Sequence, residues 1–165
     1  MKVKTIMTRD VACCAPDTTL DRAALTMREI DTGILPVVES DRLVGVVTDR
    51  DIALTLAEQD RRPSGTHVAT AMSRGALTCA PEDSVAQALA TMRARRVRRL
   101  PVVDSYGQVI GILSMNDVIL HTQPAGNGQA VSYEDTIETL QRISEHRYPV
   151  PAPQPADVTE LARCL

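Results

Sequence analysis

The sequence contains no phenylalanine and no tryptophan, and apart from histidine its only aromatic residues are Tyr106, Tyr133 and Tyr148. Surfaces that bind RNA or single strands stack bases on aromatic side chains, so this composition argues against them. The formal net charge of −3 gives no electrostatic reason to expect nucleic acid or an anionic membrane as the main partner. The one feature that could favour nucleic acid is the group of arginines between Arg93 and Arg99. Binding through these arginines is the weakest of the functional hypotheses considered below, and it would depend strongly on salt.

Long apolar runs are also lacking. No stretch approaches the ~18 apolar residues that a membrane-spanning helix needs. The first residues, MKVKTIMTRD, do not contain the apolar core of a signal peptide. We therefore expect a cytoplasmic protein with no membrane partner.

Recognisable catalytic motifs are absent as well. His67, His121 and His146 do not accompany a nucleophile pattern, and the chain has no Walker loop and no glycine-rich dinucleotide motif. No residues show metal-ligand spacing. The sequence therefore predicts a protein that is not an enzyme and that requires no metal or cofactor.

The four cysteines are Cys13, Cys14, Cys79 and Cys164, and none forms a CxxC motif. We expect small buried thiols in a reducing compartment. A redox switch at Cys13 or Cys14 is the alternative, although no electropositive neighbour in the sequence would activate either thiol.

What the chain does contain is a duplication, because residues 6–52 resemble residues 71–118. At an offset of 65 the repeat pairs Met7 with Met72, Pro16 with Pro81, Met27 with Met92 and Pro36 with Pro101. A one-residue insertion near Tyr106 raises the offset to 66, which pairs Gly45 with Gly111, Thr48 with Ser114 and Asp51 with Asp117. A unit of about 60 residues buries little surface alone, so we expect the two copies to pack together about a pseudo-twofold axis.

Each copy is predicted to contain a strand, a helix, two strands and a second helix. The expected strands are Val11–Cys14, Leu35–Val38 and Leu43–Thr48, then Ala76–Cys79, Leu100–Val103 and Val109–Ser114. The second helices are expected to begin near Asp49 and Met115. The apolar stripes of the first helices are Leu20, Ala24, Met27 and Ile30 in one copy, and Val85, Leu89 and Met92 in the other. Ser84 and Gln87 have the spacing of a capping box.

These elements divide the chain into a first domain at 1–60, a linker at 61–66 and a second domain at 67–122. Thr66 is expected to cap a short helix that continues to Met72. A tail follows at 123–165, with a helix near 132–146 that carries Ile137 and Leu140 on one side. Four alternating prolines at 149–155 predict an extended segment.

The most informative motif is a hydroxyl residue followed by Asp three residues later, at the end of a strand and the start of a helix. It occurs as Thr48 with Asp51 and again as Ser114 with Asp117. One interpretation is a capping box that satisfies the first N–H groups of the helix. The other is a ligand site, because a helix N-terminus favours anions and a carboxylate can accept hydrogen bonds from a sugar. The two interpretations are compatible.

The duplicated unit, its Gly-Ile-Leu-Pro-Val-Val and Arg-Leu-Pro-Val-Val strands and the VTDRDI segment resemble a tandem pair of cystathionine-beta-synthase (CBS) domains, or Bateman module. The resemblance covers roughly residues 3–121. It implies an α/β fold of two tandem CBS domains, followed here by the helical and proline-rich tail. It also implies an adenosine ligand, such as AMP, ADP, ATP or S-adenosylmethionine, in the cleft between the domains.

The resemblance implies two sites, in which the Asp holds ribose hydroxyls and aliphatic groups enclose the adenine. The first would use Thr48 and Asp51, with Gly33, Ile34 and Pro36 in the wall and Arg50 near phosphate. The second would use Ser114 and Asp117, with Arg99 and Pro101 in its wall. Arg98 and Arg99 replace Gly33 and Ile34 of the first copy, and guanidinium groups suit phosphate oxygens. We therefore expect the second site to favour the more phosphorylated ligand.

The resulting functional hypothesis is a regulatory adenosine-ligand sensor that signals to an unknown effector protein by conformational change. CBS pairs commonly dimerise through their helices, so the resemblance also implies a homodimer. The alternative is a structural or protein-interaction module with vestigial clefts, since helix capping alone would explain Thr48 and Asp51.

Overall fold

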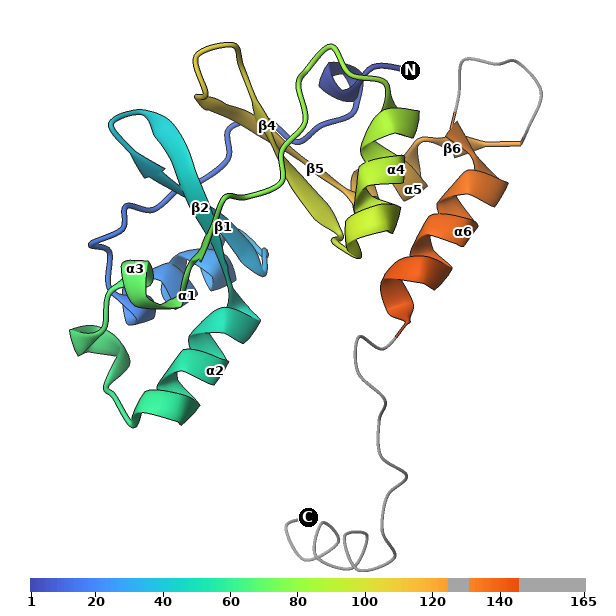
Figure 1. Ribbon diagram of the computed structural model, residues 1–165. Helices are drawn as coiled ribbons and strands as arrows, with labels where there is room; N and C mark the ends of the chain where they lie inside the picture. The colour runs from blue at the N-terminus through green and yellow to red at the C-terminus, as the bar shows by residue number, and fades with distance from the viewer. Residues whose placement is uncertain (125–130, 146–165) are drawn as a thin grey trace, which may run out of the picture.

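The computed structural model describes residues 1–124 and 131–145, which form two α/β units side by side (Figure 1). The elements up to the second repeat are η1 (Val3–Thr5), α1 (Leu20–Glu29), β1 (Ile34–Glu39), β2 (Arg42–Thr48), α2 (Asp49–Gln59) and η2 (Pro63–Gly65). Those that follow are α3 (Val68–Ala71), β3 (Ser73–Arg74), α4 (Val85–Arg95), β4 (Arg99–Val103), β5 (Val109–Ser114), α5 (Met115–Leu120), β6 (Thr122–Gln123), β7 (Val131–Ser132) and α6 (Tyr133–Ser144). The order confirms the α/β fold of two similar units.

The two central hairpins have the same register, as the repeat predicts. Ile34 lies opposite Thr48 in the first hairpin, and Arg99 lies opposite Ser114 in the second. Both strand pairs contain a bulge at the equivalent place, after Val37 and after Val102. Each hairpin therefore ends with its hydroxyl residue at the start of the helix that follows, α2 or α5.

The strands predicted at Val11–Cys14 and Ala76–Cys79 do not form. Each segment makes only one parallel bridge, from Cys14 to Val37 and from Cys79 to Val102. Prolines at 16 and 81 follow two residues later, and a proline has no N–H with which to extend a ladder. The prediction of a strand in these two segments was therefore wrong, and each is reduced to a single bridge.

The helix faces were predicted well for α4 and less well for α1. Val85, Leu89 and Met92 are buried, and Ser84 and Gln87 form the predicted capping box. On α1 the buried residues are Leu20, Ala23 and Met27, whereas Ala24 is exposed. Ile30 is 47% exposed because α1 ends at Glu29 and leaves it beyond the last turn.

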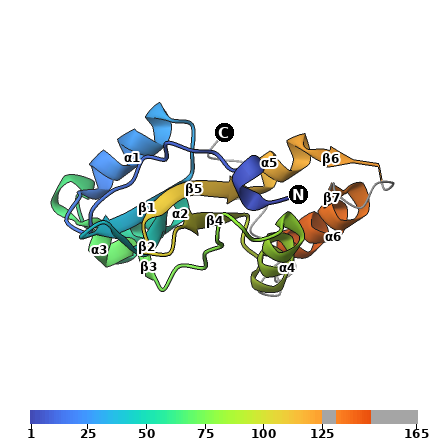
Figure 2. The same ribbon diagram turned by 90° about the horizontal axis from the view of Figure 1, so that it is seen from above.

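The first turns of the two repeats are exchanged between the units. Val3, Ile6 and Met7 are buried in the core of the second unit, and Val68 and Met72 are buried in the core of the first. Figure 2 shows the N-terminal turn beside α5 and β5, far from α1. The sequence divides the chain at 61–66, but each spatial core includes residues from both sides of that linker.

Matched backbone hydrogen bonds hold the exchanged segments. Thr8 and Ile112 exchange two N–H···O bonds of 2.9 Å, while β3 pairs with β2 at Gly45 and Val46. Gly45 and Gly111 are the points of closest approach, where a Cβ would lie 2.6 Å from the Ser73 carbonyl oxygen and 2.8 Å from that of Thr8. Each exchanged segment therefore passes directly over a glycine of the other unit.

The short helix after the linker is not capped as predicted. His67 occupies the N-cap of α3 without a side-chain bond, and Thr66 instead donates its hydroxyl to the carbonyl of Arg62 at 3.0 Å. Thr66 is 2% exposed, so its hydroxyl needs this partner. The predicted Thr66 cap was wrong.

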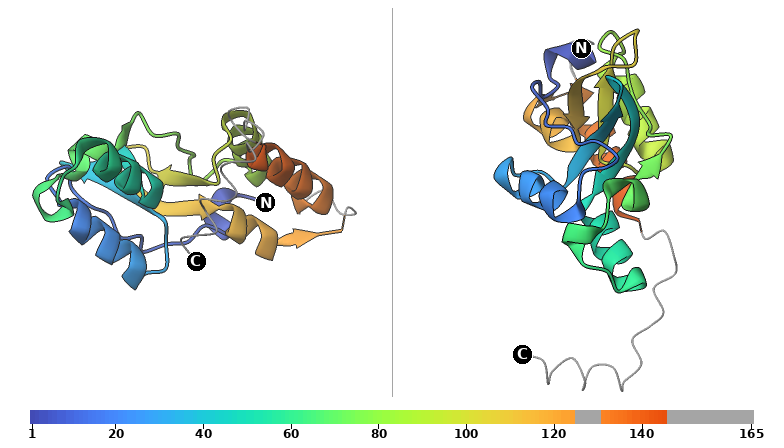
Figure 3. Two further views of the ribbon diagram at one scale, coloured as in Figure 1. Left: turned by 90° about the horizontal axis from the view of Figure 1, so that it is seen from below. Right: turned by 90° about the vertical axis from the view of Figure 1, so that its left-hand side faces the viewer.

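The helix predicted in the tail is α6, and it packs along α4 (Figure 3). Its buried side chains are Thr136, Thr139 and Ile143, with Leu140 partly buried, whereas Ile137 is 53% exposed. The hydroxyls of Thr136 and Thr139 donate to carbonyl groups one turn earlier, which allows them to face the core. The proline-rich segment at 149–155 lies outside the described residues.

Among the described residues, no helix has the length and apolar character that crossing a membrane requires.

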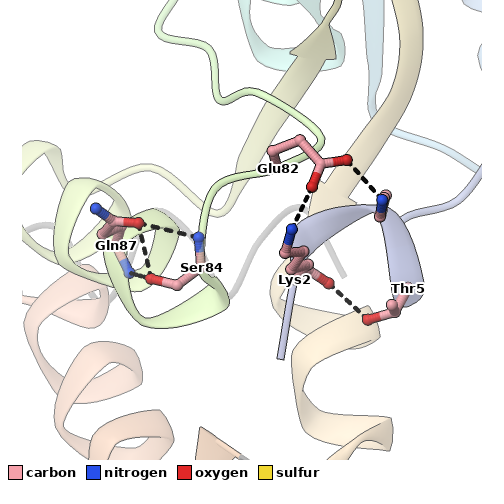
Figure 4. Close-up of polar contacts among 6 residues, drawn as sticks. Lys2, Thr5, Glu82, Ser84 and Gln87 are labelled. Atoms are coloured by element: carbon pink, nitrogen blue, oxygen red, sulfur yellow. Dashed lines mark hydrogen bonds and ion pairs between the residues drawn. The ribbon is translucent and has the colours of Figure 1, made fainter.

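Two lysines of the N-terminal turn contact the carboxylate of Glu82, which precedes α4, and Figure 4 shows Lys2 beside Glu82. Lys2 and Lys4 both donate to Glu82, Lys4 at 2.6 Å. The hydrogen bonds from Lys2 and then Lys4 lower the pKa of the Glu82 carboxyl from 4.5 to about 2. All three side chains are exposed, so water screens the pairs and their contribution to stability is small.

Alanine at Gly45 or Gly111 should destabilise the protein by about 1–3 kcal/mol, because its Cβ would overlap the exchanged strand. Urea unfolding measures the change. Gly65→Ala is the control, since no atom lies within 4 Å of its Cβ position. Equal stability of all three variants would contradict the close packing of the crossings.

Replacing Glu82 with Gln should lower Tm slightly at about pH 6 and low salt. A depressed pKa gives stability that is fully present above the unfolded value of 4.5 and is lost as pH falls toward about 2. The Tm difference between wild type and Glu82→Gln should therefore disappear across that interval, and also in high salt. A difference that is constant with pH would show that the ion pairs are not its cause.

Candidate functional site

A cleft of about 990 Å³ lies between the two units, and small-molecule sites commonly have volumes of roughly 300–1,000 Å³. The first repeat contributes residues 33–34, 46 and 48–51 to its walls. The second repeat contributes β3 and the residues directly after it, 73–77, together with residues 96–99 and 101. Ile143 and Glu145, at the end of α6, complete the lining.

The structure brings most of the predicted site residues into this one cleft. The predicted residues that line it are Gly33, Ile34, Thr48, Arg50, Asp51, Arg98, Arg99 and Pro101. Pro36, which is buried within β1, does not line it. Ser114 and Asp117 do not line it either. The predicted grouping of Arg99 and Pro101 with Ser114 and Asp117 is therefore corrected, since the two wall residues face the cleft of Thr48 and Asp51.

Thr48 and Asp51 form a complete capping box at the start of α2. The Thr48 hydroxyl accepts from the Asp51 N–H at 3.1 Å and donates to Asp51 Oδ2 at 2.6 Å, while the Thr48 N–H donates to the same oxygen at 2.9 Å. The capping interpretation is thus confirmed. Among the described residues no partner contacts Asp51 Oδ1, so this oxygen can still accept hydrogen bonds from a ligand.

Ser114 and Asp117 form the same box on α5, but their outer oxygen is engaged. Asp117 Oδ2 accepts from the Ser114 N–H at 2.7 Å and from its hydroxyl at 2.6 Å. Asp117 Oδ1 accepts from the hydroxyl of Thr8 at 3.1 Å. Ser73 occupies the equivalent place in the first unit and, within the described part of the chain, has no such bond to Asp51. The two repeats therefore differ in which carboxylate is available.

The cleft carries an excess of positive charge. Its arginines are Arg50, Arg74, Arg96, Arg98 and Arg99, and its carboxylates are Asp49, Asp51 and Glu145. Gly33 lies against the carboxylate of Asp49, where a Cβ would come within 2.9 Å of Oδ2. Such a cleft favours an anionic ligand.

Sequence reasoning missed Arg74, Arg96 and Glu145 as lining residues. Arg96 belongs to the arginine run, but its position depends on a left-handed backbone turn (φ 53°) at the end of α4. Arg74 reaches the cleft through the strand exchange, and Glu145 through the docking of α6 on α4. The repeat pattern contains no information on either contact.

Carboxylates of α6 and of its end partly neutralise the arginines between Arg93 and Arg99. Arg93 pairs with Glu138 at 2.5 Å, and Arg96 pairs with Glu145 at 2.9 Å. These ion pairs leave less free positive charge for a polyanionic surface, which further weakens the nucleic-acid interpretation.

The described residues include no cluster of three or more His, Cys, Asp or Glu side chains that could hold a metal ion. Asp51 uses Oδ2 for helix capping, and the remaining cleft side chains are mainly arginine and aliphatic groups. Chemically, this arrangement can bind and orient an anion that also carries hydroxyl groups.

Three cysteines of the described chain are free thiols. Burial raises the pKa of Cys14 and of Cys79 to about 11, and partial desolvation by neighbouring atoms also raises the pKa of Cys13. A raised pKa keeps the thiol protonated and unreactive near neutral pH. Cys13 is exposed rather than buried as expected, but its environment does not activate it. Cys164 lies outside the described residues.

Comparisons with known proteins agree with this architecture. Residues 3–58 and 68–122 match the family model of the CBS domain. The chain is 37% identical over 119 residues to the CBS domain-containing protein YhcV of Bacillus subtilis, which covers 72% of this chain and 84% of YhcV.

Two solved structures of similar proteins contain adenosine compounds. CBSX2 in complex with AMP is 30% identical, with a TM-score of 0.64 over 72% of this chain and 93% of that one. The CBS domain pair of MJ0100 in complex with 5′-methylthioadenosine and S-adenosyl-L-methionine is 26% identical, with a TM-score of 0.66 over 73% and 94%. Two family matches that span both repeats, on a fold of two matching units, establish that the chain belongs to the CBS domain family as a tandem pair.

Proposed function

We propose that the protein binds an adenosine ligand in the cleft between its two CBS domains and acts as a regulatory sensor. The observation that carries the proposal is that Asp51, whose Oδ1 has no partner among the described residues, lines the same cleft of about 990 Å³ as Arg98 and Arg99. The carboxylate oxygen would accept hydrogen bonds from the ribose hydroxyls. The guanidinium groups would contact phosphate oxygens.

The adenine would lie against the aliphatic wall of the cleft. Ile34, Val46, Leu77 and Pro101 line it and offer apolar surface without any aromatic ring. The complexes of CBSX2 with AMP and of MJ0100 with adenosine compounds support this choice of ligand class. The arginines favour AMP, ADP or ATP over S-adenosylmethionine, which has no phosphate.

The regulatory part of the proposal follows from the position of the cleft. A ligand that contacts both units shifts their relative arrangement by its difference in affinity for the alternative arrangements. An effector protein of the cytoplasm would read that shift. Leu25 on α1 is 39% exposed and Leu54 on α2 is 47% exposed, and we infer that these helices contribute to a homodimer interface.

Replacing Asp51 with Ala should weaken AMP or ATP binding by about 10- to 100-fold, since hydrogen bonds to a charged group contribute about 1.5–3 kcal/mol. Isothermal titration calorimetry measures the change. Asp117→Ala is the matched control, because it removes the same capping carboxylate outside the cleft and should leave affinity within about twofold. A larger loss in Asp117→Ala than in Asp51→Ala would place the site in the other repeat.

Removing the arginines tests the orientation of the ligand. The double variant Arg98→Ala/Arg99→Ala should lose about 10-fold or more in ATP affinity and much less in adenosine affinity, because only ATP carries phosphate. Equal losses for ATP and adenosine would contradict the assignment of phosphate to these residues.

A thermal-shift series with AMP, ADP, ATP and S-adenosylmethionine tests the ligand class as a whole. A ligand at 100 times its Kd should stabilise the protein by about 2.7 kcal/mol. No shift with any of the four would favour the alternative of an interaction module with vestigial clefts.

A further inference from the structure

The last turn of α6 forms part of the wall of the ligand cleft, although α6 lies outside both CBS repeats. Ile143 is 9% exposed and belongs to the core of the second unit, and both it and Glu145 line the cleft. Figures 1 and 2 show α6 lying beside α4. The cleft therefore contains a segment that is independent of the duplicated architecture.

Glu145 brings a carboxylate to the positive side of the cleft. Its Oε2 accepts a hydrogen bond from Arg96 at 2.9 Å and also pairs with Arg142. The Arg96 side chain is 25% exposed, and Arg98 and Arg99 line the same cleft. The Glu145 carboxylate therefore already occupies a guanidinium group of the kind that the phosphates of a nucleotide would bind.

We propose that Glu145 competes with the phosphates of the ligand for Arg96, so that a phosphorylated ligand displaces Glu145 and releases the last turn of α6. The inference rests on the proposed function of the cleft. A phosphate carries more charge than a carboxylate and pairs bidentately with a guanidinium group. Two anions on one guanidinium repel each other, so the pair opens when the phosphate binds.

Glu145 thereby becomes a specificity-determining residue. Its carboxylate lowers the affinity for a ligand in proportion to the negative charge that the ligand brings near Arg96. The loss of affinity is therefore largest for ATP and smallest for adenosine. The same contact couples ligand binding in the cleft to the docking of the last turn of α6. A bound phosphate weakens that docking, and the docked turn weakens phosphate binding to the same degree. The Glu145 N–H bonds to the carbonyl of Gln141 at 3.2 Å, and this helix-end bond would loosen when Glu145 is displaced.

The chain offers a matched control on the same pair of helices. Arg93 and Glu138 form an ion pair at 2.5 Å between α4 and α6, but neither residue lines the cleft. Glu138→Gln therefore removes an α4–α6 ion pair without changing the charge of the cleft. Any effect that arises only from weaker helix docking will appear in both variants.

The experiment is calorimetric titration of ATP and of adenosine into the full chain, as wild type, Glu145→Gln and Glu138→Gln. We expect Glu145→Gln to bind ATP about 3- to 5-fold more tightly, the size of one partly exposed charge interaction. Its adenosine affinity and both affinities of Glu138→Gln should stay within about twofold of wild type. In the wild type, ATP should speed hydrogen exchange at residues 141–145, and adenosine should not.

An unchanged ATP affinity in Glu145→Gln, or an equal gain for adenosine and for Glu138→Gln, would overturn the inference. If adenosine and ATP still bind and depend on Asp51, the proposed function survives that result. If neither compound binds wild type or Glu145→Gln, the proposed function fails and the inference fails with it.

Discussion

Backbone hydrogen bonds between Thr8 and Ile112, matched by the pairing of β3 with β2, are the contacts on which the rest of the molecule depends. They place the first turn of each repeat in the core of the other unit, so neither core is complete without residues from both sides of the linker. They also fix the segment at 73–77, which continues from β3 into the wall of the cleft. The exchanged segments and their hydrogen bonds thus hold the two units in the arrangement that forms the cleft.

The exchange also explains why the two copies of one motif are not equivalent. Thr48 and Ser114 cap their helices with nearly the same geometry. The exchanged N-terminal segment carries Thr8 to Asp117, whereas its counterpart, Ser73, does not bond to Asp51 in the described structure. Duplication therefore produced two helix caps, and one of them keeps a carboxylate oxygen available beside arginines from the other repeat.

Local features were predictable from the sequence, and contacts between distant segments were not. The hairpins and capping boxes depend on alternation and on three-residue spacing, so Ser84 and Thr48 were assigned correctly. The crossing at Gly45 needs the partner strand, which no local pattern identifies. Arg96 and Glu145 meet only because α6 docks on α4, and the buried face of α6 uses threonines that hydropathy would place outside.

The most direct test of the central claim is a crystal structure of the protein grown with AMP. The account predicts one nucleotide in the cleft, with its ribose hydroxyls bonded to Asp51 Oδ1 and its phosphate beside Arg98 or Arg99. It also predicts that Asp117 keeps its bond to Thr8. A nucleotide bound against Ser114 and Asp117, with the cleft of Asp51 unchanged, would contradict it.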